Sequence, residues 1–160
     1  MVQSLSKLYV HIIFHTKYDH IKIRNEIMSE LYAYMGAIIK DNDSMPIMIN
    51  GTDNHVHILC VMSNYISMVK LVEEIKRHSS RWIKGKGFYY WKFAWQGGYS
   101  CFSVSQSILD KTKRYIENQE EHHKRITFKE EYLMFLKEYG VEYSDKYLWT
   151  DWISAALSGR

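Results

Sequence analysis

Two histidines, a tyrosine and a glutamine have the types and spacings that could support chemistry. His55 and His57 are two residues apart in an apolar run, so in a β-strand both imidazoles project from one face. Two neighbouring imidazoles can share a metal ion if a third ligand comes from another segment. Tyr115 and Gln119 are four residues apart, about one turn of a helix, so the hydroxyl and the amide share a face. These residues predict a metal site beside a phenol.

The chemistry that fits is phosphoryl transfer through a tyrosine. A divalent ion held by two imidazoles and an amide oxygen keeps open positions that can polarise a phosphate. A phenol, of pKa about 10, becomes a nucleophile once its proton leaves near a cation. Each motif alone also has a structural reading: the histidines could be ordinary strand residues, and Tyr115 could simply pack its helix on the sheet. The catalytic interpretation therefore depends on the combination.

Four segments show the alternation of apolar side chains that is typical of strands. In the third of them, Val56 and Ile58 share one face, and the two histidines share the other. A turn at 51–54 joins the second segment to the third as a hairpin. We expect strands at 7–17, 46–49, 55–62 and 99–105.

Four segments show the three- and four-residue spacing of amphipathic helices, and each begins at a residue that can cap a helix. The third runs from Ser107 through Gln119, and the fourth opens with a capping box of Thr127 and Glu130 and ends at Gly140. The expected helix starts are Asn25, Ser67, Ser107 and Thr127.

The order of these elements, βαββαβ, predicts an α+β fold of the ferredoxin-like or RRM-like kind. Right-handed crossovers and a central hairpin give a four-stranded antiparallel sheet with two helices on one face. The tyrosine-bearing helix would cover the other face, followed by an extra C-terminal helix. We expect one domain over 1–160, with a core at about 5–121 and a helical extension at about 122–160. His55 and His57 should then lie outside the main apolar core.

Composition excludes several classes of protein. The chain has 160 residues, is 46% hydrophobic and contains one proline, which is typical of a globular domain rather than a disordered one. Cys60 and Cys101 lie in apolar runs and read as core residues in a reducing compartment, not as a disulfide. No apolar stretch approaches the ~18 residues of a membrane span, so we expect a soluble, cytoplasmic protein with no membrane partner. The net charge of +3 is compatible with nucleic acid without arguing for it.

Four stretches of the sequence together resemble one family, the single-tyrosine HUH transposases of the IS-two-hundred and IS-six-hundred-and-five group. They cover most of the chain in family order. The stretches are GTDNHVHIL at 51–59, KLVEEIKRHSSRWI at 70–83, FAWQGGYSCFSVS at 93–105 and KRYIENQEEHHKR at 113–125. The resemblance implies that Tyr115 is the nucleophile and that His55, His57 and Gln119 hold the metal.

The resemblance implies a DNA transposase that cleaves and rejoins single-stranded DNA at the ends of an insertion sequence. It implies a covalent 5′-phosphotyrosine intermediate, a Mg2+ or Mn2+ ion, and hairpins at the element ends that are recognised as single strands. Members of the family are dimers, so we expect a homodimer in which Tyr115 can act in trans on the histidine pair of the other subunit. The expected location is the cytoplasm of a prokaryotic cell, with nucleoid association when the protein binds DNA.

Basic residues on the second helix, joined by Lys86 beyond it, are the candidates for DNA contact, because cations pair with backbone phosphates. Glu73 and Glu74 dilute this patch, and a solvated helix face would explain the charges equally well. The resemblance favours DNA. The candidates are Lys70, Lys76, Arg77, Arg81, Lys84 and Lys86.

Four further histidines are left outside the expected metal site. His11 and His15 share the sheet face of the histidine pair if the first strand neighbours the third, either as polar residues under the third helix or as partners of the metal ligands. His122 and His123 read as solvent-facing residues at a helix end, with no pattern that suggests a second ion.

Two other functions fit parts of the pattern. A non-catalytic RRM-like module uses the same sheet to bind single-stranded nucleic acid by stacking, and it would not need Tyr115 or Gln119. A hydrolytic metalloenzyme would use His55 and His57 with water as the nucleophile and would release its product without a covalent stage. A metal-dependent protein–DNA adduct separates the transposase from both.

Overall fold

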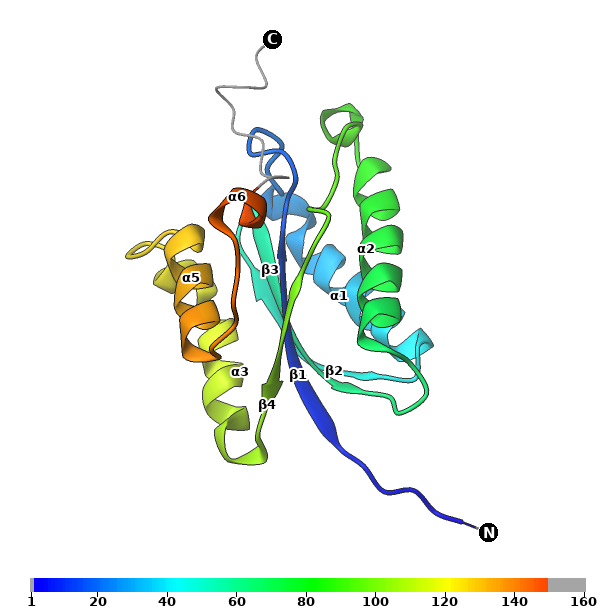
Figure 1. Cartoon of the computed structure of the whole chain (residues 1–160). Coiled ribbons are helices and arrows are strands. Elements are labelled where there is room, and N and C mark those ends of the chain that lie inside the picture. Colours follow the sequence, from blue (N-terminus) through cyan, green and yellow to red (C-terminus); the bar gives the residue numbers. More distant parts are fainter. Residues whose placement is uncertain (1, 150–160) are drawn as a thin grey trace.

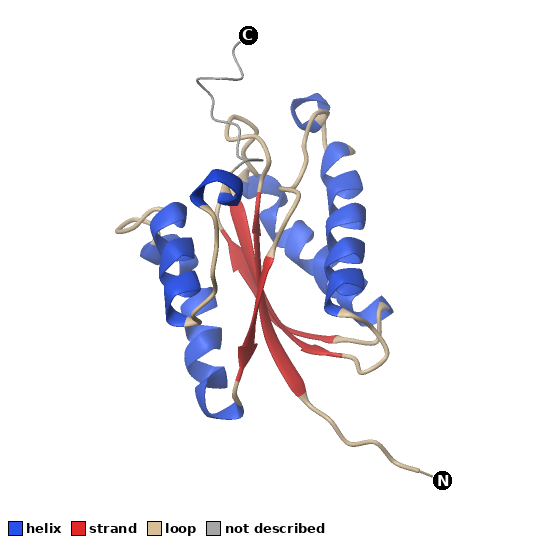
Figure 2. Ribbon diagram, in the orientation of Figure 1, coloured by secondary structure: helices blue, strands red, loops and turns tan. Residues whose placement is uncertain are grey.

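The fold is built on an antiparallel sheet of four strands, β1 (Leu8–His15), β2 (Met45–Gly51), β3 (His55–Met62) and β4 (Ser100–Val104). The strands lie side by side in the order β2-β3-β1-β4. This computed structural model describes residues 2–149, and the last part of the expected extension, 150–160, lies outside them. Helices cover both faces of the sheet (Figure 1; Figure 2). The ferredoxin-like arrangement predicted from the sequence is confirmed.

The main apolar core lies between the sheet and two long helices, α1 (Asn25–Asp41) and α2 (Met68–Lys84). Alternate strand residues point into it, and Ile12 and Ile58 are fully buried there. From the helices come residues such as Ile75, also fully buried. None of the helices within residues 2–149 combines the length and the apolar character that a membrane crossing requires.

The predicted helix caps are correct for α2 and wrong at two other places. Ser67 accepts a hydrogen bond from a backbone N–H in the first turn of α2. Asn25 does not cap α1, because the helix begins one residue earlier and the capping position falls on Arg24, which makes no side-chain bond. Ser107 does not cap the third helix either, because a 3-10 turn, η2 (Gln106–Ile108), precedes that helix.

The helix that carries Tyr115 ends before it reaches Gln119. The sequence predicts one helix through both residues. Instead α3 (Leu109–Glu117) stops, and a short α4 (Gln119–His122) begins after Asn118. The expected geometry of one shared helix face is therefore wrong.

Asn50 on β2 gives a physical reason for this break. Its Nδ2 donates hydrogen bonds to the carbonyl oxygens of Ile116 and Glu117, both at 3.0 Å. The last carbonyls of a helix lack partners within it, so a side chain that satisfies them favours an end at this point. The strand edge thus determines where α3 stops.

The extension beyond the tyrosine helix contains α5 (Phe128–Glu138), whose two ends are well defined. Thr127 and Glu130 form the predicted capping box at its start. At its end Gly140 adopts a positive φ of 63°, the left-handed conformation that commonly terminates helices. The α5 helix is therefore an ordered element with its own start and stop signals.

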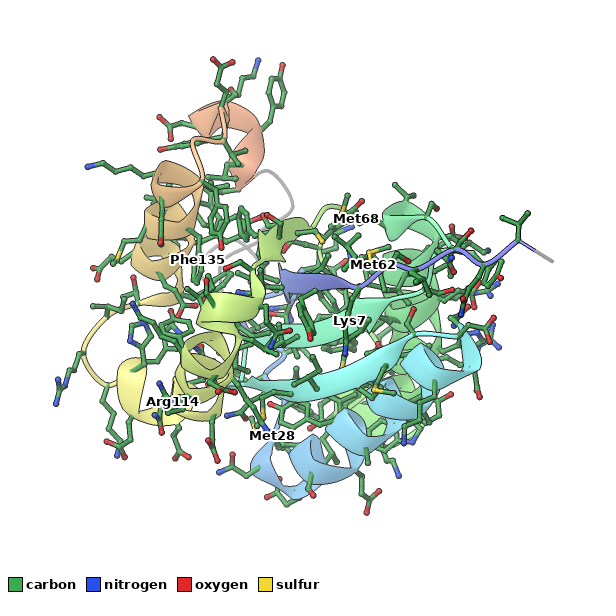
Figure 3. The ribbon with its side chains drawn as sticks, turned by 90° about the horizontal axis from the view of Figure 1, so that it is seen from below. Lys7, Met28, Met62, Met68, Arg114 and Phe135 are labelled. Carbon is green, nitrogen blue, oxygen red and sulfur yellow. The ribbon has the colours of Figure 1, made fainter. Side chains whose placement is uncertain are left out.

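The second face of the sheet is covered by α3, α5 and the short α6 (Asp145–Leu148) (Figure 1). Two small apolar clusters lie beneath them: one between α5 and the sheet, and one between α3 and the sheet. Figure 3 shows the side chains that fill this space, with Phe135 packed against the first cluster. Buried polar side chains lie with these clusters on the same face, and they form the candidate site.

Candidate active site

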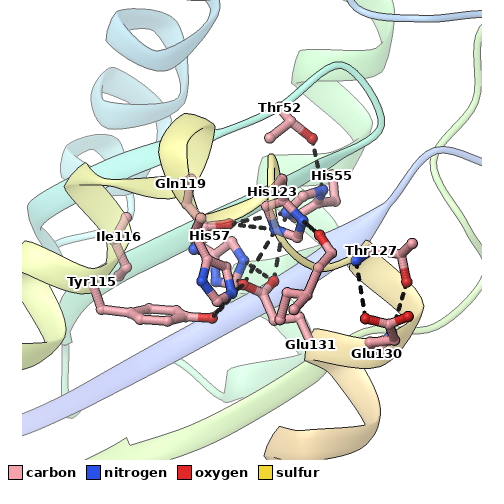
Figure 4. Close-up of polar contacts among 12 residues, drawn as sticks. Thr52, His55, His57, Tyr115, Ile116, Gln119, His123, Thr127, Glu130 and Glu131 are labelled. Atoms are coloured by element: carbon pink, nitrogen blue, oxygen red, sulfur yellow. Dashed lines mark hydrogen bonds and ion pairs between the residues drawn. The ribbon is translucent and has the colours of Figure 1, made fainter.

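The two predicted metal-binding histidines lie side by side on the second face of the sheet (Figure 4). The rings of His55 and His57 are 5.1 Å apart between centroids, and both residues are buried, at 1% and 0% exposure. They lie outside the main apolar core, as expected. They are nevertheless inside the protein, because α5 covers them: Phe128 stacks on His55 at 4.2 Å.

The turn before β3 fixes the orientation of His55. Gly51 lies so close that an added Cβ would be 2.1 Å from the His55 carbonyl oxygen, which no larger residue could accept without movement. The His55 Nδ1 atom lies 2.8 Å from Asn54 Oδ1, an oxygen that only accepts, so Nδ1 carries the proton. Burial, followed by the nearby His57, lowers the pKa of His55 well below its usual value. The ring is therefore neutral, with a lone pair on Nε2.

His57 is held between two partners. Its Nδ1 atom is 2.7 Å from Nε2 of His11, and its Nε2 atom is 2.8 Å from Oε1 of Glu131. His11 is buried on β1, and burial followed by the charge of His57 lowers the pKa of His11. A partner on the outer nitrogen is how proteins fix the ring of a metal-binding histidine. His11 thus lies beside His57 rather than merely beneath a helix.

Gln119 reaches the site although it is not on the tyrosine helix. It is fully buried, and its Oε1 atom is 3.1 Å from Nε2 of His55. Its amide nitrogen donates to Oε2 of Glu131 at 3.2 Å. The structure therefore brings together His55, His57 and Gln119, the three residues predicted to hold a metal.

Glu131 on α5 occupies the centre of the site, and sequence reasoning missed it. Its Oε1 lies 2.8 Å from Nε2 of His57 and 3.6 Å from Nε2 of His55. A signal was present: Glu131 stands three residues after Phe128 and four before Phe135, which places it on the apolar face of its helix. A carboxylate on a buried helix face needs partners, and here it has several.

The electrostatics of Glu131 follow from those partners. Burial alone would raise the pKa of this carboxyl, but hydrogen bonds from His123 and His57 and the charge of the imidazoles hold it well below its usual range. Glu131 is therefore a buried anion, 1% exposed, among imidazole rings.

Tyr115 points into the same cluster. Its hydroxyl donates a hydrogen bond to Oε2 of Glu131 and lies 3.1 Å from Nε2 of His122. Its ring centroid is 6.0 Å from that of His57. Burial, and after it the negative charge of Glu131, raise the pKa of Tyr115 above its usual range, so the phenol is protonated and acts as a donor.

The expectation that His122 and His123 face solvent is wrong. His122 Nε2 lies 3.0 Å from Oε2 of Glu131, and His123 Nε2 lies 3.2 Å from the same oxygen. The short α4 helix turns both rings inward, towards the carboxylate that α5 supplies. His123 also places Nε2 3.0 Å from Oε1 of Gln119.

The donor set fits a divalent cation. Within the described residues, His55, His57, His123 and Glu131 each offer one ligand atom, and these atoms all lie within 4.8 Å of one another. Imidazole nitrogen and carboxylate oxygen are common ligands of divalent metals in proteins. A cluster of histidines and a glutamate can therefore bind such an ion here.

A cleft of about 270 Å³ leads from the surface to the tyrosine. Tyr115, His122 and Glu131 are among the residues that line it, and Lys111 of α3 is an exposed cation on its wall. The cleft gives a phosphate group a route towards the phenol, with a positive charge close by.

The predicted DNA-contact residues belong to α2, apart from Lys86 just beyond its end, and α2 lies across the sheet from this cleft (Figure 1). Three of them are engaged by carboxylates. Lys70 and Arg77 pair with Glu74 at 3.0 and 2.8 Å, and Lys86 pairs with Glu30 at 3.2 Å. Exposed pairs of this kind are weak, but they reduce the net charge that α2 offers to DNA.

The other three α2 candidates differ among themselves. Lys76 donates hydrogen bonds to the carbonyl oxygens of Gln96 and Gly98, at 2.6 and 2.7 Å. Arg81 and Lys84 are exposed, and neither pairs with a carboxylate in the part of the chain that the structure describes. They are the α2 cations best placed to meet an external phosphate.

The sequence profile of the family described as Transposase IS200 like matches residues 4–119. This span ends at Gln119, so it contains the four predicted site residues but neither His123 nor Glu131. No curated protein sequence matches the chain significantly.

Two solved structures share the fold. A protein described as a transposase from Deinococcus radiodurans R1 superposes with a TM-score of 0.58 at 24% identity, over 74% of this chain and 98% of that one. The REP-associated tyrosine transposase, solved bound to a REP hairpin, gives a TM-score of 0.56 at 11% identity, over 79% of this chain and 74% of that one. At these identities the likeness is one of fold.

Proposed function

The chain belongs to the IS200-like transposase family and is a DNA-processing enzyme; from this premise we propose that it cleaves and rejoins single-stranded DNA through Tyr115. In this proposal His55, His57 and Gln119 hold a Mg2+ or Mn2+ ion. The DNA is bound covalently between cleavage and rejoining, as a 5′-phosphotyrosine.

The observation that carries the proposal is the contact between Tyr115 and the histidine pair through one carboxylate. The two oxygens of Glu131 face different groups: Oε1 bonds to His57, and Oε2 accepts from the Tyr115 hydroxyl. The side chain of Glu131 therefore links the Tyr115 hydroxyl directly to His57, one of the candidate metal ligands.

The cleavage step makes one bond and breaks one. The Tyr115 oxygen bonds to the phosphorus of the scissile phosphodiester, and the bond from phosphorus to the 3′ oxygen breaks. The phenolic proton, which Tyr115 shares with Glu131 in a hydrogen bond, ends on the leaving 3′ oxygen, which becomes a hydroxyl, so the proton count balances. Rejoining reverses these changes with another 3′ hydroxyl.

The metal-binding residues prepare the site for this step. A divalent ion held there supplies positive charge that offsets the charge developing on the phosphate. His11 and Asn54 occupy the outer nitrogens of His57 and His55, so the inner nitrogens are the ones that would hold the ion.

The proposed substrate is a DNA hairpin at the end of an insertion sequence. The REP-associated tyrosine transposase was solved with a hairpin, which supports a similar substrate for this chain. A hairpin presents a single strand next to a duplex stem. A single strand of this kind could enter the cleft that Tyr115 lines.

A DNA-binding surface at the end of α2 is a further part of the proposal. Beyond Lys84 the chain forms η1 (Phe88–Tyr90), where Phe88 and the following Trp91 are 85% and 57% exposed. Their rings are nearly parallel, at 19°, and Lys92 lies 4.8 Å from the Trp91 ring. Exposed rings beside cations can stack unpaired bases while the cations meet phosphates.

Action in cis is supported by the contacts within one chain. Tyr115 already shares Glu131 with His57 of its own subunit, so no partner is needed to bring them together. The homodimer expected from the resemblance stays part of the proposal. The packing of α5 on the sheet likewise supports one domain rather than a core with a separate tail.

Denaturing electrophoresis tests the proposal. With hairpin DNA and Mn2+ we expect a protein–DNA adduct that resists denaturation, disappears on chelation and is absent in Tyr115→Phe, while Tyr115→Phe still binds the hairpin. Tyr65→Phe, at an 87% exposed position, is the matched control and should form the adduct normally. Cleavage without an adduct would favour a hydrolytic metalloenzyme, and binding without cleavage would favour an RRM-like module.

A further inference from the structure

We infer that Glu131 and His123 are ligands of the metal ion held by His55, His57 and Gln119, so that the α5 helix completes the metal centre. This inference rests on the proposed function. It adds two ligands that lie beyond residue 119, outside the span that the family profile matches. The ion would then have five protein donors, and one of six positions would be left for a phosphate oxygen.

One ring nitrogen of His123 and one of His55 point towards the same side-chain oxygen, Oε1 of Gln119. His123 Nδ1 lies 3.0 Å from the carbonyl oxygen of Ile126, which only accepts, so Nδ1 carries the proton. Its other ring nitrogen, Nε2, faces two oxygen atoms, Oε1 of Gln119 at 3.0 Å and Oε2 of Glu131 at 3.2 Å.

His55 repeats this arrangement. Its outer nitrogen, Nδ1, contacts Asn54, and its inner nitrogen, Nε2, faces Gln119 Oε1 at 3.1 Å and Glu131 Oε1 at 3.6 Å. The inner nitrogens of both rings and the oxygens of Gln119 and Glu131 therefore converge on one buried space. Imidazole nitrogens and side-chain oxygens that converge in this way are the ligand atoms that a divalent cation takes in proteins.

The distances between the ligand atoms also fit a shared ion. An octahedral ion with bonds of about 2.1 Å holds neighbouring ligand atoms roughly 3.0 Å apart. The contacts of Gln119 with His55 and His123 are 3.1 and 3.0 Å, and that of Glu131 with His57 is 2.8 Å. These three contacts thus already have the separations that shared coordination produces, and His55 and Glu131, at 3.6 Å, are farther apart.

The charge of Glu131 also suits a divalent ion. Two imidazoles and an amide are neutral, so they would leave a buried divalent ion with its full charge among apolar side chains. The Glu131 carboxylate cancels one of the two positive charges and supplies the hard oxygen ligand that Mg2+ and Mn2+ prefer. It also joins the ion to the nucleophile, because its other oxygen holds the Tyr115 hydroxyl.

Calorimetric titration of the whole protein with Mn2+ alone, without DNA, tests the inference. We expect Glu131→Gln to weaken Mn2+ binding by about tenfold or more, and His123→Gln to weaken it by a smaller factor. Glu138→Gln is the matched control: the same substitution, seven residues later on α5, at an exposed carboxylate. It should bind Mn2+ within about twofold of the unmodified protein.

Hydrogen exchange gives a second readout that needs no variant. If α5 supplies a ligand, Mn2+ must stabilise the docked helix, so the amides of α5 should exchange more slowly with the ion present. Should Glu131→Gln fail to fold, this measurement and the shorter Glu131→Asp, expected to lose affinity, still decide the question.

The outcomes separate this inference from the proposed function. Wild-type affinity in Glu131→Gln, with binding lost in His57→Ala, would overturn the role of Glu131 and leave the histidine site in place. Unchanged exchange of α5 on addition of Mn2+ would also overturn it. Absence of Mn2+ binding by the unmodified protein would overturn both the inference and the metal-dependent part of the proposed function.

Discussion

Nε2 of His11 and Nδ1 of His57 lie 2.7 Å apart, on neighbouring strands that are 46 residues apart in the chain. His11 is buried, and its side-chain hydrogen bond is to His57, so we expect its effect on a metal to pass through the ring that it orients. Strand pairing makes this contact possible, because β1 and β3 run antiparallel with their histidines on one face.

His11→Ala should therefore weaken Mn2+ binding by about tenfold, the lower end of the range for residues that orient a ligand. His11→Gln, which can still offer a hydrogen bond to Nδ1, should recover part of the loss. Calorimetric titration measures both. His20→Ala, at an exposed histidine, is the control. Equal affinities in all four proteins would show that His57 needs no partner.

Asn50→Ala should loosen the end of the tyrosine helix. Two hydrogen bonds to helix carbonyls are lost, so we expect about 1 to 2 kcal/mol less stability and a slower rate of adduct formation. Thermal unfolding and a time course with hairpin DNA measure these effects. Asn42→Ala removes a similar side-chain bond, to the Ile38 carbonyl of α1, and should cost stability without slowing the reaction. A normal rate in Asn50→Ala would show that the break in the helix does not position Tyr115.

Trp91→Ala should weaken the binding of single-stranded DNA by about 1 to 3 kcal/mol, the value of one stacked base, with little change in salt dependence. Lys84→Ala should instead lower the slope of affinity against salt by about 0.7, the value of one phosphate contact. Fluorescence anisotropy over a salt series distinguishes the two effects. Tyr65→Ala, an exposed ring elsewhere, serves as the control. Loss of affinity in Tyr65→Ala as large as in Trp91→Ala would argue against a specific stacking surface.

The two thiols should be unreactive in the folded protein. Burial raises the pKa of Cys60 to about 12 and that of Cys101 to about 11, from ordinary values near 9. We expect slow labelling by a thiol reagent at pH 8 and fast labelling in urea. Folding raises both thiol pKa values, so the two protonated thiols favour the folded state. Their contribution to stability is complete below pH 9 and is lost as the pH rises towards 11 and 12. Thermal unfolding midpoints that stay constant from pH 8 to pH 11 would contradict the predicted loss of stability at high pH.

The strands and the histidine pair were predictable because their signals are local. Alternation over 55–62 places Val56 and Ile58 in the main core and the histidines on the opposite face, and the structure agrees. The capping box at Thr127 was equally local and equally reliable. Such features depend on residues within a few positions of one another.

The break between α3 and α4 was not predictable in this way. It depends on Asn50, which is 66 residues from the Ile116 carbonyl that it binds. Glu131 was missed for a related reason. Its place on the apolar face of α5 was visible, but its partners are histidines on β3 and α4, and only the folded chain shows that they converge.

The distance along the chain between His57 and Glu131, 74 residues, has a consequence for biosynthesis. Synthesis proceeds from the N-terminus, so the sheet with its histidines can form while the residues after 105 are still unmade. A product terminated early, after β4, would hold the histidine pair but lack Tyr115, Gln119 and Glu131. If these residues act as proposed, the chain gains its activity only after translation has passed α5.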